Sequence, residues 1–201
     1  NNFRRSTNSG VNWSSYDYAY TGQFINPTDY DDADNKLYCA SSGGEYLRWE
    51  NPQTGETFTR VPVAGFNGIR ISSLILSPYT PKRMFAAMEN GKVFRLDNIQ
   101  TGNPAATDIS GTGRPAAYIS CVNPGTDDHN LIVTYSNYGT QHVWITGNGG
   151  SSWMNVSVSP NRRSHRSATR GGRLNINDYD CRNSSGPISW KCSRKYSMIK
   201  P

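Results

Sequence analysis

Short apolar runs recur along the chain in a fixed order, and polar turns separate them. The first run of each unit ends at or near a proline, at 22–27, 71–78 and 117–124. A second run follows at 36–42, 83–89 and 130–136, and a third, richer in aromatic residues, at 45–51, 92–98 and 142–148. After another polar turn, a fourth run stands at 58–63, 106–110 and 153–158. This order predicts three units of four strands each.

The spacing of the units indicates their architecture. The second runs begin 47 residues apart both times, and the third runs begin 47 and 50 residues apart. Partial alternation of apolar and polar residues, as in 92–97, is typical of half-buried strands. Four strands per unit at a period of roughly 40–50 residues is the pattern of a β-propeller blade. A β-sandwich also has short strands with regular turns, but it is not expected to repeat this order three times.

We therefore expect an all-β chain that forms a partial β-propeller of about three four-stranded blades. The expected blades cover 22–69, 70–115 and 116–158, after a lead-in segment at 1–21. Almost no helix is expected, because no 12-residue window shows a 3.6-residue apolar period. Propellers close a ring of roughly 4–8 blades, so we interpret the chain as a piece of a larger propeller or as one that pairs with other copies.

Composition agrees with short strands and many turns. Of the 201 residues, 19 are Gly, 11 Pro and 12 Tyr, whereas only 35% are hydrophobic and 18% charged. This balance argues against a helical bundle and a coiled coil. No run of 18 apolar residues is present, so we expect no membrane-spanning helix.

Charge separates the body of the chain from its end. Residues 1–158 hold 11 Lys/Arg against 13 Asp/Glu, a net charge of −2, whereas residues 159–201 hold 10 against 2, a net charge of +8. The blade pattern also stops after residue 158. Three interpretations of this basic tail stay open: a disordered segment, an off-frame translation of a fourth blade, or a segment that binds polyanions.

The third unit contains a sharper motif, TGNGGSSW at 146–153, which fits S/T-x-D/N-x-G-x-S/T-W. In this turn the Asn side chain is expected to bond backbone amides of its own turn, the Gly to supply a positive φ, and the Trp to pack between blades. Incomplete versions stand at matching places, NPQTGETF at 51–58 and NIQTG at 98–102. We expect a structural role for the motif residues Thr146, Asn148, Gly150, Ser152 and Trp153.

This motif resembles the Asp-box, or BNR repeat, of sialidase-superfamily and sortilin-like β-propellers. The stretch 21–156 is similar to the propeller regions of large secreted proteins of Bacteroidetes-type bacteria, on the runs TGQFINPTDYDDADNKLYCA, YLRWENPQTG, LSPYTPKRMF and LIVTYSNYGTQHVWITGNGGSSW. Such proteins are often exported by the type IX secretion route. The resemblance implies a secreted or cell-surface location, and it implies the fold more strongly than any activity.

Candidate catalytic residues are present by type only. A sialidase needs an arginine triad, a tyrosine nucleophile with a glutamate partner, and a further acid. The candidates are Arg48, Arg70, Arg95, Arg114, Tyr118 and Glu89. None lies in a recognisable sialidase motif, and Arg48 and Arg95 occupy equivalent third-run positions, which favours a structural role. We therefore expect no catalytic residue in the chain.

Other reactive side chains also favour structural roles. Four aspartates, Asp29, Asp31, Asp32 and Asp34, cluster in one loop, but their spacing does not fit a calcium-binding EF-hand. The three histidines, His129, His142 and His165, are scattered. We expect Cys39 and Cys121 to be buried free thiols, and Cys181 and Cys192 are close enough in sequence for a disulfide. No metal and no cofactor is expected.

The function expected from these patterns is non-catalytic binding of an extracellular protein or polysaccharide, as one module of a larger secreted protein. Nucleic acid is not an expected partner. The tyrosines are candidates for stacking on sugars or peptides, at Tyr16, Tyr18, Tyr20, Tyr30, Tyr135 and Tyr138. The alternatives are a fragment of a sialidase-like or xyloglucanase-like glycoside hydrolase and a polyanion-binding protein that acts through its basic tail.

Overall fold

The computed structural model describes residues 2–17, 22–55, 57–157, 173–176, 179–183 and 190–194. The expected all-β fold is confirmed: apart from one short 3-10 helix, η1 (Ala64–Phe66), every regular element in the described residues is a strand. The chain divides into two compact units, Asn1–Ser157 and Val158–Pro201. No helix in the described residues is long and apolar enough to cross a membrane.

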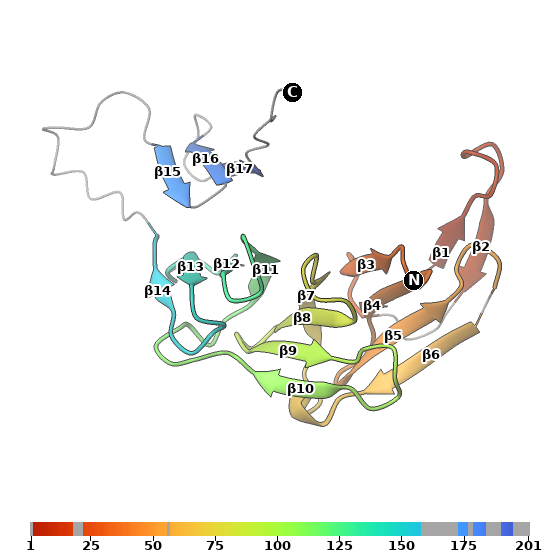
Figure 1. Ribbon diagram of the computed structural model, residues 1–201, viewed down its shortest axis with the longest axis horizontal. Helices are drawn as coiled ribbons and strands as arrows, with labels where there is room; N and C mark the ends of the chain where they lie inside the picture. Colours follow the sequence, from red (N-terminus) through yellow and green to blue (C-terminus); the bar gives the residue numbers. More distant parts are fainter. Residues whose placement is uncertain are drawn as a thin grey trace, which may run out of the picture. The chain divides into compact units, whose positions relative to one another are not determined.

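Three four-stranded antiparallel sheets follow one another in chain order in the first unit (Figure 1). The first sheet contains β3 (Thr28–Asp31), β4 (Lys36–Ala40), β5 (Glu45–Glu50) and β6 (Thr57–Pro62). The second contains β7 (Ile71–Leu76), β8 (Arg83–Met88), β9 (Val93–Asp97) and β10 (Ala105–Asp108). The third contains β11 (Ile119–Pro124), β12 (Leu131–Tyr135), β13 (Val143–Thr146) and β14 (Met154–Asn155).

The sheets pack against each other in pairs. Strands β3, β7 and β11 are the inner strands, since β7 lies beside both β3 and β11. One apolar core fills the interface between the first and second sheets and includes Tyr38, Tyr46, Met84 and Leu96. A second core fills the interface between the second and third sheets. Successive residues of β8 belong to different cores, because side chains of a strand alternate between its two faces.

The start of the first sheet differs from the sequence expectation. The run at 22–27 was expected to be its first strand, but β3 begins at Thr28. The physical cause lies in Asn26 and Pro27. The Asn26 side chain accepts a bond from Gln23 N and donates one to Ala40 O at 2.9 Å, which holds the run as a loop. Pro27 has no N–H to donate, and its carbonyl only accepts from Ala40 N.

A hairpin of β1 (Asn2–Arg5) and β2 (Ser14–Asp17) covers the first sheet on the side opposite the second sheet. Phe3 and Tyr16 lie with ring centroids 5.8 and 5.1 Å from that of Trp49, which stacks on Phe58 at 4.7 Å. Aromatic pairs at these distances add to the stability gained from burial. This face of the first sheet therefore already has a partner.

The two cysteines of the first unit are free, but they differ in exposure. Cys39 is buried as expected, and burial raises the pKa of its thiol to about 12. The expectation of a buried thiol is wrong for Cys121, which is exposed. It lies on the face of the third sheet that points away from the second sheet, next to a β-bulge between Ile119 and Cys121.

The second unit contains a three-stranded antiparallel sheet of β15 (Arg173–Ile176), β16 (Tyr179–Asn183) and β17 (Trp190–Arg194). Its register pairs Cys181 with Cys192 across two neighbouring strands. The remainder of the basic tail, including His165, lies outside the described residues, and the three interpretations of the tail stay predictions.

Candidate functional site

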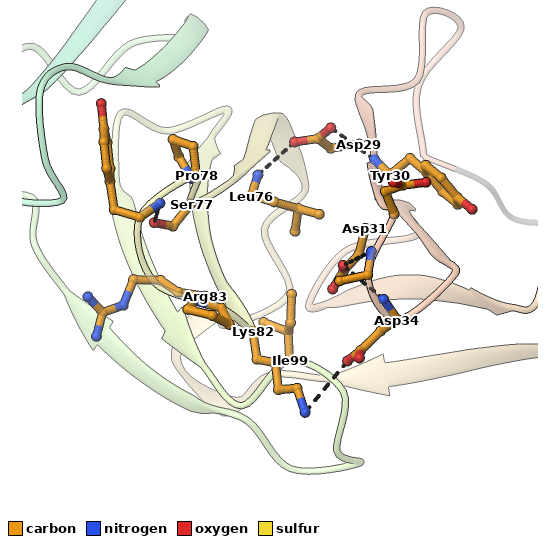
Figure 2. A pocket seen from close by; sticks show the side chains of 14 residues that line it. Asp29, Tyr30, Asp31, Asp34, Leu76, Ser77, Pro78, Lys82, Arg83 and Ile99 are labelled. Carbon is orange, nitrogen blue, oxygen red and sulfur yellow. Dashed lines mark hydrogen bonds and ion pairs between the residues drawn. The ribbon is translucent and has the colours of Figure 1, made fainter.

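A groove of about 400 Å³ lies where the first sheet meets the second, at the end of the inner strands (Figure 2). The β3–β4 hairpin forms one wall, and the loop from β7 to β8 forms the other. Leu76 and Ile99 supply apolar surface. The full lining comprises Asp29, Tyr30, Asp31, Asp32, Ala33, Asp34, Leu76, Ser77, Pro78, Tyr79, Pro81, Lys82, Arg83 and Ile99.

The first wall consists of the aspartate cluster, and two of its side chains hold the backbone in place. Asp31 Oδ1 accepts bonds from Ala33 N and Asp34 N at 3.1 and 3.2 Å, which fixes the β3–β4 turn. Asp29 Oδ2 accepts from Leu76 N of the second sheet at 2.7 Å. Asp29 therefore links the first sheet to the second.

A carboxylate from the third sheet fixes the second wall. Asp128, in the β11–β12 loop, accepts bonds from Ser77 Oγ and Thr80 Oγ1 at 2.5 Å each and pairs with Arg83 Nη1 at 2.8 Å. Arg83 also pairs with Asp97 at 2.5 Å. Burial alone would raise the pKa of Asp128, but these three donors outweigh burial and lower it. The β7–β8 loop is therefore tied to the third sheet.

This pKa shift predicts a loss of stability in acid. A lowered folded pKa stabilises the protein above the unfolded pKa of about 3.9, and that contribution disappears as the pH falls through the folded pKa. We expect Asp128→Asn to lower the free energy of unfolding by about 1–3 kcal/mol at neutral pH and to flatten its decline between about pH 5 and pH 3. Urea titrations at several pH values measure both effects. An unchanged acid slope in the variant would contradict the assignment.

Among the side chains that line the groove, negative charges outnumber positive charges. Arg83 is committed to Asp97 and Asp128, so Lys82 is the lining cation that faces the cluster, 3.7 Å from Asp34. Figure 2 shows Asp31 and Asp34 on one side and Lys82 reaching across toward Asp34. The carboxylates outnumber this cation, and Asp32 is exposed. The groove is therefore suited to a ligand that brings positive charge or hydrogen-bond donors.

The motif at 146–153 forms a closed hydrogen-bonded turn. Thr146 Oγ1 donates to Asn148 Oδ1 at 2.9 Å and accepts from Gly150 N at 3.1 Å. Asn148 Oδ1 accepts from Ser152 N at 3.0 Å, and Asn148 Nδ2 donates to Ser152 Oγ at 2.8 Å. Trp153 Nε1 donates at 3.0 Å to the carbonyl of Ile109, which directly follows β10 of the second sheet. All five motif residues thus take part in one turn, which contacts the second sheet through Trp153.

Arg114 accompanies this turn. Its guanidinium carbon lies 4.5 Å from the centre of the Trp153 ring, a distance typical of a cation–π contact. Its Nε donates to Ser110 O at 2.7 Å and its Nη1 to Tyr135 Oη at 2.8 Å. Burial lowers the pKa of Arg114. These contacts give Arg114 a structural role between the second and third sheets.

Two further catalytic candidates, Arg48 and Arg95, also bond to other residues of the fold. Arg48 donates to the carbonyls of Ile99 and Thr101 at 3.1 and 3.0 Å. Arg95 occupies the matching register position in the second sheet and pairs with Asp97 at 3.1 Å. Both arginines therefore bond to the protein itself, as the repeat predicts.

Three candidates do meet at the opposite end of the inner strands, through a residue that the sequence analysis did not single out. Gln23 accepts from Tyr118 Oη at 2.6 Å and donates to Glu89 Oε1 at 3.0 Å. Arg70 pairs with Glu89 at 3.3 Å. Gln23 had no visible motif, and only the packing of the sheets shows its position. The four side chains form a chain of hydrogen bonds between sheets.

The other candidates are spread over the first unit. Tyr30 lines the groove, Tyr135 bonds to Arg114, Tyr16 packs in the hairpin contact, and Tyr138 is 95% exposed. Tyr18 and Tyr20 lie outside the described residues. His129 and His142 lie in different loops of the third sheet. No group of three or more His, Cys, Asp or Glu in the described part of the chain is placed to hold a metal ion.

The arrangement of sheets recurs in a solved structure. YCF48 from Cyanidioschyzon merolae, a β-propeller, matches with a TM-score of 0.55 and 14% sequence identity, over 79% of this chain and 55% of that one. The fold is that of a partial β-propeller. At this identity the similarity concerns the fold alone, and the chain spans about half the length of the neighbour. No family model and no curated protein matches the sequence.

The three four-stranded sheets are therefore propeller blades, and the groove lies between the first two blades. The aspartate cluster was visible in the sequence, but the second-blade wall and Asp128 were not, since they lie 42 or more residues downstream of it. A weak signal was present: polar turns follow the first runs at SPYT (77–80) and NPGTDD (123–128). Only the stacking of blades shows that these turns contact each other.

Proposed function

We propose that this propeller is a non-catalytic, extracellular binding module whose groove between the first two blades holds a positively charged segment of a partner protein. The observation that carries the proposal is the groove itself: a wall of aspartates facing one lysine, with both walls held in place by inter-blade hydrogen bonds. Such preorganisation reduces the free-energy cost of binding.

The chemistry of the groove favours this ligand over the alternatives. A lysine or arginine side chain can lie between Asp32 and Asp34, and its aliphatic part can contact Leu76. An anionic glycan would meet uncompensated carboxylates, which repel it. The extracellular location is supported by the resemblance of the stretch 21–156 to exported propellers. The non-catalytic role is supported by the structural contacts of Arg48, Arg95 and Arg114.

The proposal predicts selective binding of cationic peptides. We expect the full chain to bind fluorescein-labelled hexalysine but not hexaglutamate in fluorescence anisotropy, with weaker binding at high salt. Asp32→Asn combined with Asp34→Asn removes two groove charges and should weaken hexalysine binding about tenfold. The matched control is Asp108→Asn, which removes a carboxylate that pairs with Lys92 on another part of the second blade.

Each other outcome has a defined meaning. Equal binding of hexalysine by the double variant and the control would overturn the groove as the site. Binding of neutral xyloglucan oligosaccharides in its place, lost in the double variant, would assign the groove to a glycan. Release of reducing sugar from xyloglucan or from a sialylated glycan by the purified chain would overturn the non-catalytic role.

A further inference from the structure

A second groove, of about 620 Å³, lies where the β1–β2 hairpin meets the first blade. Phe3, Leu37 and Trp49 supply apolar surface, and Arg4 and Arg5 are the charged side chains of its described lining. No described carboxylate lines this groove, whereas four aspartates line the groove between the first two blades. The two grooves therefore differ in the sign of their charge. We call the second one the arginine groove.

Arg4 and Arg5 differ from the other cations of the first unit in their lack of an ion pair. Among the described residues of that unit, every other Lys or Arg except Arg114 pairs with a carboxylate. Arg114 is held between the second and third blades by Ser110 and Tyr135. The cations that the fold leaves without a counter-charge thus gather in one groove, which favours an anionic ligand there.

The fold fixes the position of Arg5. Its Nη1 donates to the carbonyls of Pro52 and Gly55 at 2.9 and 3.3 Å, and its guanidinium carbon lies 4.8 Å from the centre of the Tyr16 ring. Its Nε is buried and has no hydrogen-bond partner among the residues that the structure describes. A buried N–H of a charged group without a partner costs free energy, and a nearby anion offsets that cost through its charge.

Neutral polar side chains surround the two arginines. Ser6, Thr7 and Thr54 bring hydroxyls to the lining, and Gln53 brings an amide. A sugar ring offers hydroxyls at its edge and C–H groups on its faces, which suit such polar groups and the apolar surface beside them. A carboxylate on the ring suits an arginine. An acidic peptide supplies the carboxylates without the hydroxyls. We propose that the arginine groove binds an acidic oligosaccharide made of uronic acid units.

Fluorescence anisotropy of labelled tetragalacturonate, mixed with the full chain, tests the proposal. We expect saturable binding of this acid and at least about tenfold weaker binding of its neutral methyl ester. Arg4 is exposed, and Arg4→Gln should weaken binding of the acid about tenfold. Arg70→Gln is the matched control, since it removes the same charge beside the second blade. Absence of binding, or equal binding by the two variants, would overturn the proposal.

A second variant leaves both arginines in place. Gln53 is exposed, so Gln53→Glu introduces a carboxylate into the groove, and we expect it to weaken binding of tetragalacturonate at least about tenfold. Gln141→Glu makes the same change at an exposed position between β12 and β13 and should have no effect. Equal binding by these two variants would place the ligand elsewhere. Hexaglutamate bound as tightly as tetragalacturonate would show attraction of charge alone and overturn the sugar as the ligand.

The arginine groove does not depend on the proposed site for cationic peptides. Tyr30 lines both grooves, but the aspartates line only the groove between the first two blades among the described residues. The double variant Asp32→Asn and Asp34→Asn should therefore weaken binding of hexalysine and leave binding of tetragalacturonate unchanged. Loss of tetragalacturonate binding in this variant would overturn the arginine groove as a separate site, whatever the result for hexalysine.

Discussion

Replacing Gly150 with alanine is expected to destabilise the propeller strongly. Gly150 has φ of +90°, a conformation that L-residues rarely adopt. A Cβ at this position would lie 2.3 Å from the Ile109 carbonyl oxygen and 2.6 Å from the Ile109 Cβ. Both neighbours belong to the adjacent blade, so relief of the contact requires the third blade to move away. We expect a loss of about 3–5 kcal/mol in the free energy of unfolding, measured by urea denaturation.

Two other glycines separate the causes of this loss. Gly139 has φ of +75° and open space where its Cβ would stand, so Gly139→Ala reports backbone strain alone. Gly102 has open space and is not among the positive-φ glycines, so Gly102→Ala introduces neither backbone strain nor a close contact. We expect losses of about 1 kcal/mol for Gly139→Ala and near zero for Gly102→Ala. Equal losses for Gly150 and Gly139 would show that contact with the second blade is not the cause.

Phe85→Ala is expected to have an effect of similar size through a different mechanism. Phe85 is fully buried in the core between the second and third blades, where it packs among Val122, Leu131 and Val133. Truncation removes apolar surface from the core and leaves a cavity that two stacked sheets cannot easily close. The expected loss is about 3–5 kcal/mol. Thermal and urea denaturation followed by circular dichroism measure it.

The chain offers a matched control for this substitution. Phe24 is 97% exposed, so Phe24→Ala removes the same atoms from solvent and should change stability by less than about 0.5 kcal/mol. A large effect of Phe24→Ala together with a small effect of Phe85→Ala would show that the two residues are placed wrongly. Such a result would also remove the basis for the blade interface.

The repeat in the sequence predicted the fold because each blade is a local structure. Strands β4, β8 and β12 begin at residues 36, 83 and 131, close to the predicted 36, 83 and 130. Antiparallel neighbours joined by short turns depend mainly on nearby residues. The prediction of a strand at 22–27 was wrong for an equally local reason. There, hydrogen bonds of the Asn26 side chain and the Pro27 carbonyl replace those of a strand ladder.

The groove could be predicted only in part. The aspartates of the β3–β4 turn stand out in the sequence, but their contacts depend on which turn the next blade brings beside them. Asp29 bonds to Leu76, 47 residues away, and Asp128 bonds to Ser77, 51 residues away. One chain does not reveal such pairings, because they arise from the stacking of blades. The hydrogen bonds from Gln23 to Glu89 and Tyr118 could not be predicted for the same reason.

The second blade has no free face, and this has a mechanical consequence. Along β8, Met84, Ala86 and Met88 belong to one core, and Phe85 and Ala87 belong to the other. A shift of this one strand therefore displaces both neighbours at once. The strand begins at Arg83, which lines the groove and is tied to the third blade through Asp128. The groove lining and the two blade interfaces thus share this one strand.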